Sequence, residues 1–199
     1  MRRVNAATAE DEEMSLQSCL SDHTKEEVLS DGNEVFCSRC GSHEEATKVV
    51  QFQGGYCPRV LVLILKRFER KRRSNSNFNM LSARVMTEKI EDLIAFPIDG
   101  LDIAPFCSQR NHVRQHVGQP QEEEEEEKDS LYDLFAVCNH YGRAGFGHYT
   151  SNVREWRSDN SLGDQWFAID DEVVQKCSER EVVSNAAYIL FYRKRGTTC

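Results

Sequence analysis

Gly145-Phe146-Gly147-His148-Tyr149-Thr150 closes a glycine-rich turn and places a histidine at the start of an expected strand. Further along, Trp166-Phe167-Ala168-Ile169-Asp170-Asp171 is an aromatic strand that runs into two carboxylates. A histidine and an aspartate on neighbouring strands can share a hydrogen bond, which selects the tautomer and orientation of the imidazole. An imidazole held in this way can act as a general base toward a nucleophile. His148 and Asp170 are therefore candidate catalytic residues. The alternative is a hydrogen-bonded pair that only supports packing.

Apolar segments on both sides of these stretches predict a mainly antiparallel sheet. Leu131–His140 precedes the glycine-rich turn and Ala186–Arg193 follows the carboxylates, and together they favour a meander of strands. Upstream, Val60–Phe68 is rich in leucine and β-branched residues. We therefore expect it to be a central strand buried on both faces.

Helical patterns are few. Leu16, Cys19 and Leu20 have helical spacing, and Thr24 with Glu27 matches a capping box at the start of a short helix or turn. The chain has no internal repeat. We expect one domain over residues 14–195, in which strands dominate.

Three segments have a composition typical of disorder or of a tail. Residues 1–13 are polar and end in acidic residues, and residues 107–130 hold polar residues and a run of glutamates, so both are predicted to be disordered. Residues 196–199 form a short tail.

The charge of the chain is concentrated in one place. The net charge is -8, with 33 acidic and 25 basic residues, but Glu122–Glu127 alone supplies six of the acidic ones and leaves 27. This balance argues against nucleic acid as a partner. No apolar run approaches the roughly 20 residues that span a bilayer, so no membrane partner is expected.

Cysteine usage favours a reducing compartment. The chain has eight cysteines, and its N-terminal residues lack the apolar core of a signal peptide, so a disulfide framework is not expected. Cys37 and Cys40 form a CxxC knuckle whose two thiolates could reach one tetrahedral zinc ion, with Gly41 permitting the tight turn. Zinc needs four ligands, so an unmetallated knuckle with two free thiols is the alternative. Other ligands would have to come from residues without such spacing: Cys19, His23, His43 and Cys57.

Taken in order, several short motifs resemble the ubiquitin-specific protease family, the papain-like cysteine deubiquitinases. They are collinear over roughly residues 14–194, apart from the acidic insertion. The motifs are Thr24-Lys25-Glu26-Glu27-Val28-Leu29, Cys37-Ser38-Arg39-Cys40, Pro58–Phe68, Phe96-Pro97, Tyr132–His140, Gly147-His148-Tyr149-Thr150, Trp166–Asp171 and Ala187–Tyr192. Each motif alone is weak, but the set in this order is specific.

The resemblance implies an α+β fold, a papain-like cysteine protease of the thumb, palm and fingers type. The present chain would supply mainly the antiparallel β palm and part of the fingers. Such an enzyme grips ubiquitin and cleaves after its C-terminal glycine, so the implied partners are ubiquitin and ubiquitinated proteins. His148 would be the general base and Asp170 its orienting carboxylate. Cys37 and Cys40 would be half of a structural Zn²⁺ site, with no cofactor for catalysis. An intracellular location, cytoplasmic or nuclear, follows from the same resemblance.

Two parts of the family pattern have no match here. The family nucleophile lies in an upstream Asn, Gly, Asn-Thr-Cys box, and Cys19 lacks those neighbours. No CxxC motif precedes Cys37 either. We therefore expect a C-terminal part of a catalytic domain, with no nucleophile of its own and inactive when isolated. The alternatives are a non-catalytic ubiquitin-binding or interaction module derived from the same fold, and a small zinc-knuckle adaptor.

Overall fold

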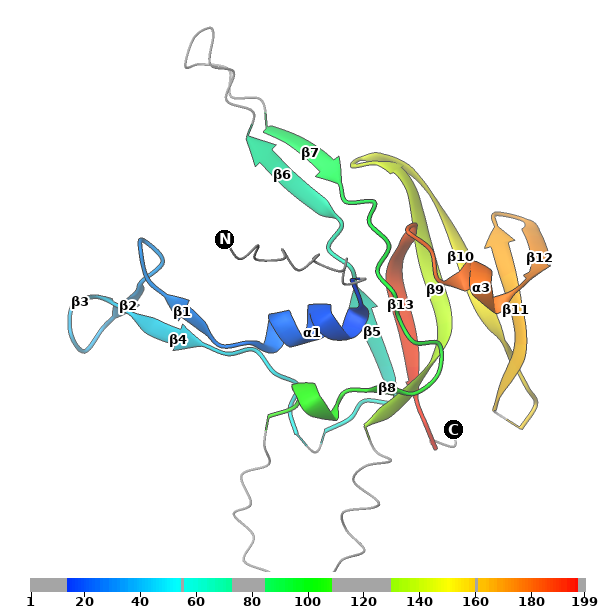
Figure 1. The fold of residues 1–199 in the computed structure, drawn as a ribbon, viewed down its shortest axis with the longest axis horizontal. Coiled ribbons are helices and arrows are strands. Elements are labelled where there is room, and N and C mark those ends of the chain that lie inside the picture. Colours follow the sequence, from blue (N-terminus) through cyan, green and yellow to red (C-terminus); the bar gives the residue numbers. More distant parts are fainter. Residues whose placement is uncertain (1–13, 55, 73–84, 109–129, 160, 197–199) are drawn as a thin grey trace, which may run out of the picture.

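The structure is a computed structural model of the chain. It describes residues 14–54, 56–72, 85–108, 130–159 and 161–196 (Figure 1). The predictions for residues 1–13, for most of the insertion at 107–130 and for residues 197–199 of the tail lie outside the described residues. No helix in the described ranges is long and apolar enough to cross a membrane.

A seven-stranded antiparallel sheet forms the body of the molecule. In spatial order its main path is β12 (Val173–Cys177), β11 (Leu162–Asp170), β10 (Phe146–Trp156), β9 (Leu131–Arg143), β13 (Ala187–Lys194) and β5 (Val60–Ile64), and β8 (Leu101–Asp102) pairs with β9. The predicted meander is confirmed for β9 to β11, and β12, which the sequence does not predict as a strand, continues it. The last strand of the chain, β13, does not extend that meander but pairs with β9 on its other side.

Three two-stranded ribbons extend from the body (Figure 1). They are β1 (Glu27–Leu29) with β4 (Ala46–Lys48), β2 (Val35–Cys37) with β3 (Ser42–Glu44), and β6 (Phe68–Arg72) with β7 (Val85–Lys89). The first two lie end to end beyond α1, and the third projects in another direction. Their positions match the finger and palm regions that the resemblance implies.

The helices are short, and the longest is α1 (Leu16–Thr24). It begins at a capping box formed by Ser15 and Ser18, and it buries Leu16 and Leu20. The predicted capping box at Thr24 and Glu27 is wrong. The Thr24 hydroxyl donates back to carbonyls in the last turn of α1, and Glu27 begins β1. The other helices in the described ranges are η1 (Ala104–Phe106) and α3 (Glu179–Val182).

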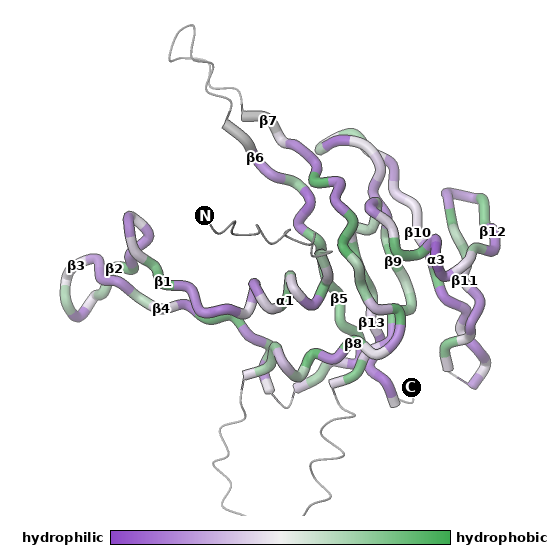
Figure 2. The backbone as a smooth tube through the Cα atoms, viewed as in Figure 1, coloured by the Kyte–Doolittle hydropathy of each residue, from purple (hydrophilic) through white to green (hydrophobic). Residues whose placement is uncertain are grey.

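The hydrophobic core lies under the middle of the sheet, where apolar residues concentrate along the central strands (Figure 2). Its fully buried members include Leu101, Leu134, Val137 and Leu190. Burying each such side chain contributes about 1.5–3 kcal/mol. Tyr192 is also buried, and its hydroxyl donates to the Pro97 carbonyl at 2.7 Å, so its polar atom is not left unpaired.

The strand expected to be central lies instead at an edge of the sheet. Among the described strands, β5 pairs with β13 only, and it ends at Ile64 rather than Phe68. Leu61 is buried, but Val60, Val62 and Ile64 are 48%, 48% and 58% exposed. The prediction of burial on both faces is therefore wrong. The apolar run of β5 does have two apolar faces, but the described residues cover only one of them.

Candidate active site

The candidate site lies on the hairpin formed by β9 and β10. The two strands join through a tight turn in which Arg143 is paired with Phe146, and Gly145 adopts a φ of +82° that favours glycine. The three glycines at 142, 145 and 147 predict a loop over residues 141–147, but in the structure only residues 144 and 145 lie outside the two strands. His148 lies opposite Tyr141, two residues into β10.

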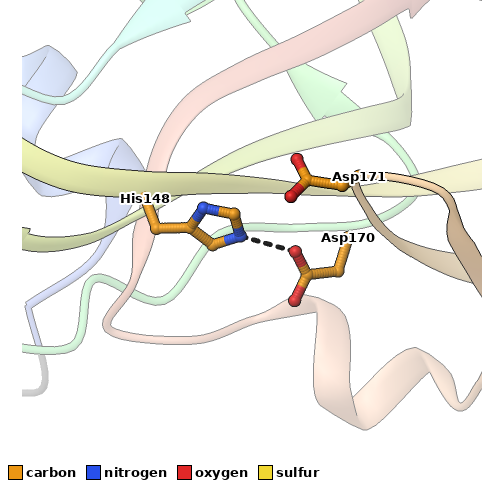
Figure 3. A group of neighbouring side chains, drawn as sticks. All are labelled: His148, Asp170 and Asp171. Atoms are coloured by element: carbon orange, nitrogen blue, oxygen red, sulfur yellow. Dashed lines mark hydrogen bonds and ion pairs between the residues drawn. The ribbon is translucent and has the colours of Figure 1, made fainter.

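The structure brings the two predicted catalytic residues together. His148 Nε2 lies 2.5 Å from Asp170 Oδ1 (Figure 3). The pairing of Ser151 with Ile169 explains this contact. Side chains alternate along a strand, so this register directs both residues to the same face of the sheet, on adjacent strands.

The contact with Asp170 defines which ring nitrogen of His148 carries a proton and which one can act as a base. An ionised carboxylate only accepts hydrogen bonds, so Nε2 of His148 carries the proton and donates it to Asp170. In the neutral ring, Nδ1 is then the acceptor. The hydrogen bond to Asp170, and next the charge of Asp170, raise the pKa of His148, against a small opposing effect of desolvation. Both side chains are at least half exposed, so a reactant can reach them.

A second carboxylate stands beside the pair. Ligand atoms of His148, Asp170 and Asp171 all lie within 4.8 Å of one another (Figure 3). Asp171 has a φ of +49° at the turn between β11 and β12, a backbone conformation that non-glycine residues seldom adopt. Its negative charge adds to the rise in the pKa of His148. The sequence shows that two carboxylates follow one another, but it does not predict that Asp171 lies in the site.

A row of buried amides supports the same face of the sheet. The Asn139 side-chain amide donates to Asn152 Oδ1 at 2.7 Å and to the Thr150 hydroxyl at 3.4 Å. Asn152 in turn donates to the Cys177 sulfur at 3.5 Å. These contacts tie β9, β10 and β12 together beneath the pair. The row is not evident from the sequence, in which its only signal is polar residues at strand positions that alternate inward.

The CxxC knuckle has the local geometry of a half-site for zinc. The Gly41 N–H donates to the Cys37 carbonyl at 2.8 Å, and Gly41 has a φ of +74°. Hydrogen bonds from the Cys40 and Arg39 backbone and from Cys40 lower the pKa of the Cys37 thiol. Thiolates are the form that binds zinc, so this turn suits a metal ligand. Within the described ranges, no third histidine, cysteine or carboxylate completes a group with Cys37 and Cys40.

No cysteine joins the His148 group in the part of the chain that the structure describes. Cys19, the cysteine compared above with the family nucleophile, lies on α1 and packs against the core. It lines a groove of about 980 Å³ between α1 and the strands β5 to β7, together with Leu65 and Arg67.

Comparisons with known proteins find related sequences and structures. The family model described as ubiquitin carboxyl-terminal hydrolase matches residues 11–192. Mouse ubiquitin carboxyl-terminal hydrolase 4 is 32% identical over 186 residues, and human ubiquitin carboxyl-terminal hydrolase 19 is 35% identical over 185 residues. These alignments cover 94% and 92% of this chain but only 16% and 12% of the relatives.

Similar solved structures come from the yeast SAGA DUB module that contains Ubp8, Sgf11, Sus1 and Sgf73. The module bound to monoubiquitin matches with a TM-score of 0.61 at 29% identity, and the module bound to ubiquitin aldehyde with 0.59 at 28% identity. Each match covers 94% of this chain and 34% or 35% of the solved chain. The chain thus spans about a third of the matched structures and less than a fifth of these two curated relatives.

Proposed function

The chain belongs to the ubiquitin carboxyl-terminal hydrolase family, and on this premise we propose that it carries the general base and orienting carboxylate of a thiol-dependent ubiquitin hydrolase. The reaction is cleavage after the C-terminal glycine of ubiquitin, which releases ubiquitin from proteins. The observation that carries the proposal is the 2.5 Å contact between His148 and Asp170 within a chain that matches the family over residues 11–192.

The arrangement of the pair supports a defined route for the proton. With Nε2–H donated to Asp170, Nδ1 of His148 takes the proton from an attacking thiol. The thiolate sulfur then bonds to the carbonyl carbon of the terminal glycine. The imidazolium returns its proton to the leaving amine as the C–N bond breaks. Water next attacks the thioester carbonyl carbon and gives a proton to His148. The C–S bond then breaks, ubiquitin leaves with a free C-terminal carboxylate, and the thiolate regains its proton from the imidazolium.

The charges around His148 favour this chemistry. Asp170 and Asp171 both raise the pKa of His148, so they stabilise the imidazolium that forms when the thiol loses its proton. An imidazolium beside a thiol lowers the pKa of that thiol and increases the fraction of reactive thiolate. Asp170 therefore orients the ring and also favours its charged form.

The attacking cysteine, in this proposal, comes from outside these 199 residues. The absence of a cysteine from the described His148 group and the lack of a matching cysteine box in the sequence support it. The test is hydrolysis of a ubiquitin–fluorophore conjugate by the isolated chain, for which we expect no turnover. Turnover that His148→Ala abolishes would contradict this part of the proposal, and Cys19→Ala would then report whether that thiol is the nucleophile.

A second candidate function is ubiquitin binding without hydrolysis. The same absence of a described cysteine beside His148 favours it, and two similar structures are bound to ubiquitin or ubiquitin aldehyde. Titration of fluorescent ubiquitin with the isolated chain measures binding directly. Two results would favour this function over the first: saturable binding of ubiquitin by the isolated chain, and no hydrolysis of the ubiquitin–fluorophore conjugate by the complete gene product.

A structural zinc ion is a further part of the proposal. Cys37 and Cys40 would supply two of its four ligands, and a second segment would supply the other two. The ion would then link the β2–β3 ribbon to that segment. The hydrogen bonds that lower the pKa of the Cys37 thiol, from the backbone and side chain of Cys40 and the backbone of Arg39, support the assignment. The seven described cysteines are all free, which fits the proposed reducing environment of the cytoplasm or nucleus.

A further inference from the structure

His140 lies on β9 opposite Tyr149 and faces away from His148. It is only 4% exposed, although its neighbours in the hairpin, residues 141–149, are all exposed. Its ring contacts three aromatic rings from three strands: Tyr149 at 4.8 Å, Phe68 at 5.3 Å and Tyr188 at 6.0 Å between centroids. A buried imidazole with aromatic neighbours on three strands is well placed to hold those strands in register.

The ring of His140 supports the backbone just before the catalytic histidine. A Cβ atom added at Gly147 would lie 2.2 Å from His140 Nε2 and 2.6 Å from the Tyr141 carbonyl oxygen. The imidazole therefore occupies the space that any side chain at position 147 would need. Because Gly147 directly precedes His148, removing the ring leaves this part of β10 without its support from below.

The base of the β6–β7 ribbon holds His140 from a second side. Phe68 and Lys89 face each other as the first pair of that ribbon. Phe68 packs against the ring, and Lys89 Nζ donates to the His140 carbonyl at 2.5 Å. The buried Arg67 anchors this end of the ribbon by donating to the Ala187 carbonyl of β13 at 2.6 Å.

The environment of His140 keeps its ring uncharged. Burial first, and the Lys89 ammonium second, lower the pKa of His140. Its Nδ1 has no hydrogen-bond partner among the described residues. A neutral ring at this place adds no positive charge that would oppose protonation of His148, whereas Asp170 and Asp171 favour that protonation.

We propose that His140 is a positioning residue, which supports Gly147 so that His148 stays against Asp170 and which links the β6–β7 ribbon to the catalytic hairpin. The inference rests on the proposed function, because it assigns a purpose to the geometry of the pair. His140 does not touch the reacting atoms. It acts through the backbone of β10, and the Phe68–Lys89 pair acts through it.

The test measures the pKa of each histidine separately in dilute solution. Hydrogen–deuterium exchange at the imidazole C2 position, followed by mass spectrometry across a pH series, does so in the 199-residue chain. In His140→Ala we expect the pKa of His148 to fall by at least about half a unit, toward its ordinary value of about 6.5, because the bond to Asp170 loosens. Lys89→Met should move it less in the same direction and should raise the pKa of His140 itself.

Two further variants make the outcome unambiguous. His43→Ala is the matched control, since His43 also contacts an aromatic ring but lies on the β2–β3 ribbon, and it should leave the pKa of His148 unchanged. Asp170→Asn should lower that pKa. If Asp170→Asn lowers it while His140→Ala and Lys89→Met do not, the positioning role is overturned and the catalytic pair stands. If Asp170→Asn has no effect, the pair and the proposed function fail. Should His140→Ala not fold, Lys89→Met, which leaves the ring in place, decides.

Discussion

The His148–Asp170 pair and the Cys37–Cys40 knuckle are both two-residue sites, but they are complete to different degrees. The pair comes from two neighbouring strands of the large sheet and closes at 2.5 Å. The knuckle lies on a small ribbon beyond α1, and no third ligand joins it within the described part of the chain. The described residues bring His148 and Asp170 into contact, whereas the knuckle offers only two of the four ligands that a zinc ion would need.

The difference follows from how each site is held. The register between β10 and β11 determines where His148 and Asp170 lie, and buried amides beneath them tie further strands together. The knuckle is a local turn that needs only four consecutive residues. A sheet can therefore preorganise a catalytic pair by itself, whereas a tetrahedral metal site needs ligands from a second segment.

The largest effect is expected when the imidazole of His148 is removed. In a protein that carries this chain together with its nucleophile, His148→Ala should lower kcat/KM on ubiquitin–fluorophore by at least about 10³-fold, because the proton acceptor is lost. His23→Ala, a change at an exposed histidine of α1, should leave kcat/KM unchanged. Equal activity of His148→Ala and the unmodified protein would remove the pair from the mechanism.

Asp170→Asn should have a somewhat smaller effect, about 10²-fold or more on kcat/KM, because the ring keeps its place but loses its charged acceptor. The variant also tests pH dependence. The raised pKa of His148 means that the pair stabilises the fold below its ordinary pKa and that this stabilisation is lost as pH rises through the raised value. The difference in unfolding free energy between the two proteins should therefore shrink as pH rises through the raised pKa of His148. A constant difference across pH would show that the charged pair does not form.

Gly147→Ala asks whether the register of the hairpin is as tight as the structure indicates. Its Cβ would overlap His140 and the Tyr141 carbonyl, so the start of β10 must shift. A displacement near 1 Å at His148 should cost up to about 10²-fold in kcat/KM. The far-ultraviolet circular dichroism spectrum should remain that of the folded protein. Full activity of Gly147→Ala would mean that the hairpin accommodates the added methyl group without displacing His148.

The knuckle is tested by metal content. Cys37→Ser should reduce the zinc bound to a protein with a complete site from about one ion per chain to none, and its melting temperature should fall by several degrees. Cys138→Ser, at a half-buried cysteine on β9 away from the knuckle, is the control. If the unmodified protein contains no zinc, the knuckle is a turn with two free thiols.

The smallest expected effect concerns the edge of the sheet. Val60, Val62 and Ile64 form an exposed apolar row on β5, which favours association through the strand edge. We expect the isolated chain to aggregate, and Val62→Lys to increase the concentration at which light scattering begins by a few-fold. A monomer that melts cooperatively without this substitution would contradict the expectation.

Sequence patterns predicted much of this arrangement because they are local. The alternation in Leu131–His140 and the aromatic strand before Asp170 identified β9 and β11, and with them the side chains that bear the chemistry. The failures concern non-local facts. Val60–Phe68 was expected at the centre of a sheet because an apolar run does not report how many strands flank it. The pattern at Thr24 predicts the start of a short helix or turn, because a capping pattern does not report that a helix already ends there.

By itself, the sequence determined which residues could carry the proton chemistry and the order of motifs that identifies the family. Only the tertiary structure decided that Nε2 of His148 is the nitrogen engaged by Asp170, that Asp171 adds its charge, and that His140 lies beneath Gly147. The physical reason is that strand identity depends on a two-residue period along the chain. Contacts across strands depend on register and strand order, which the packing of the whole sheet selects.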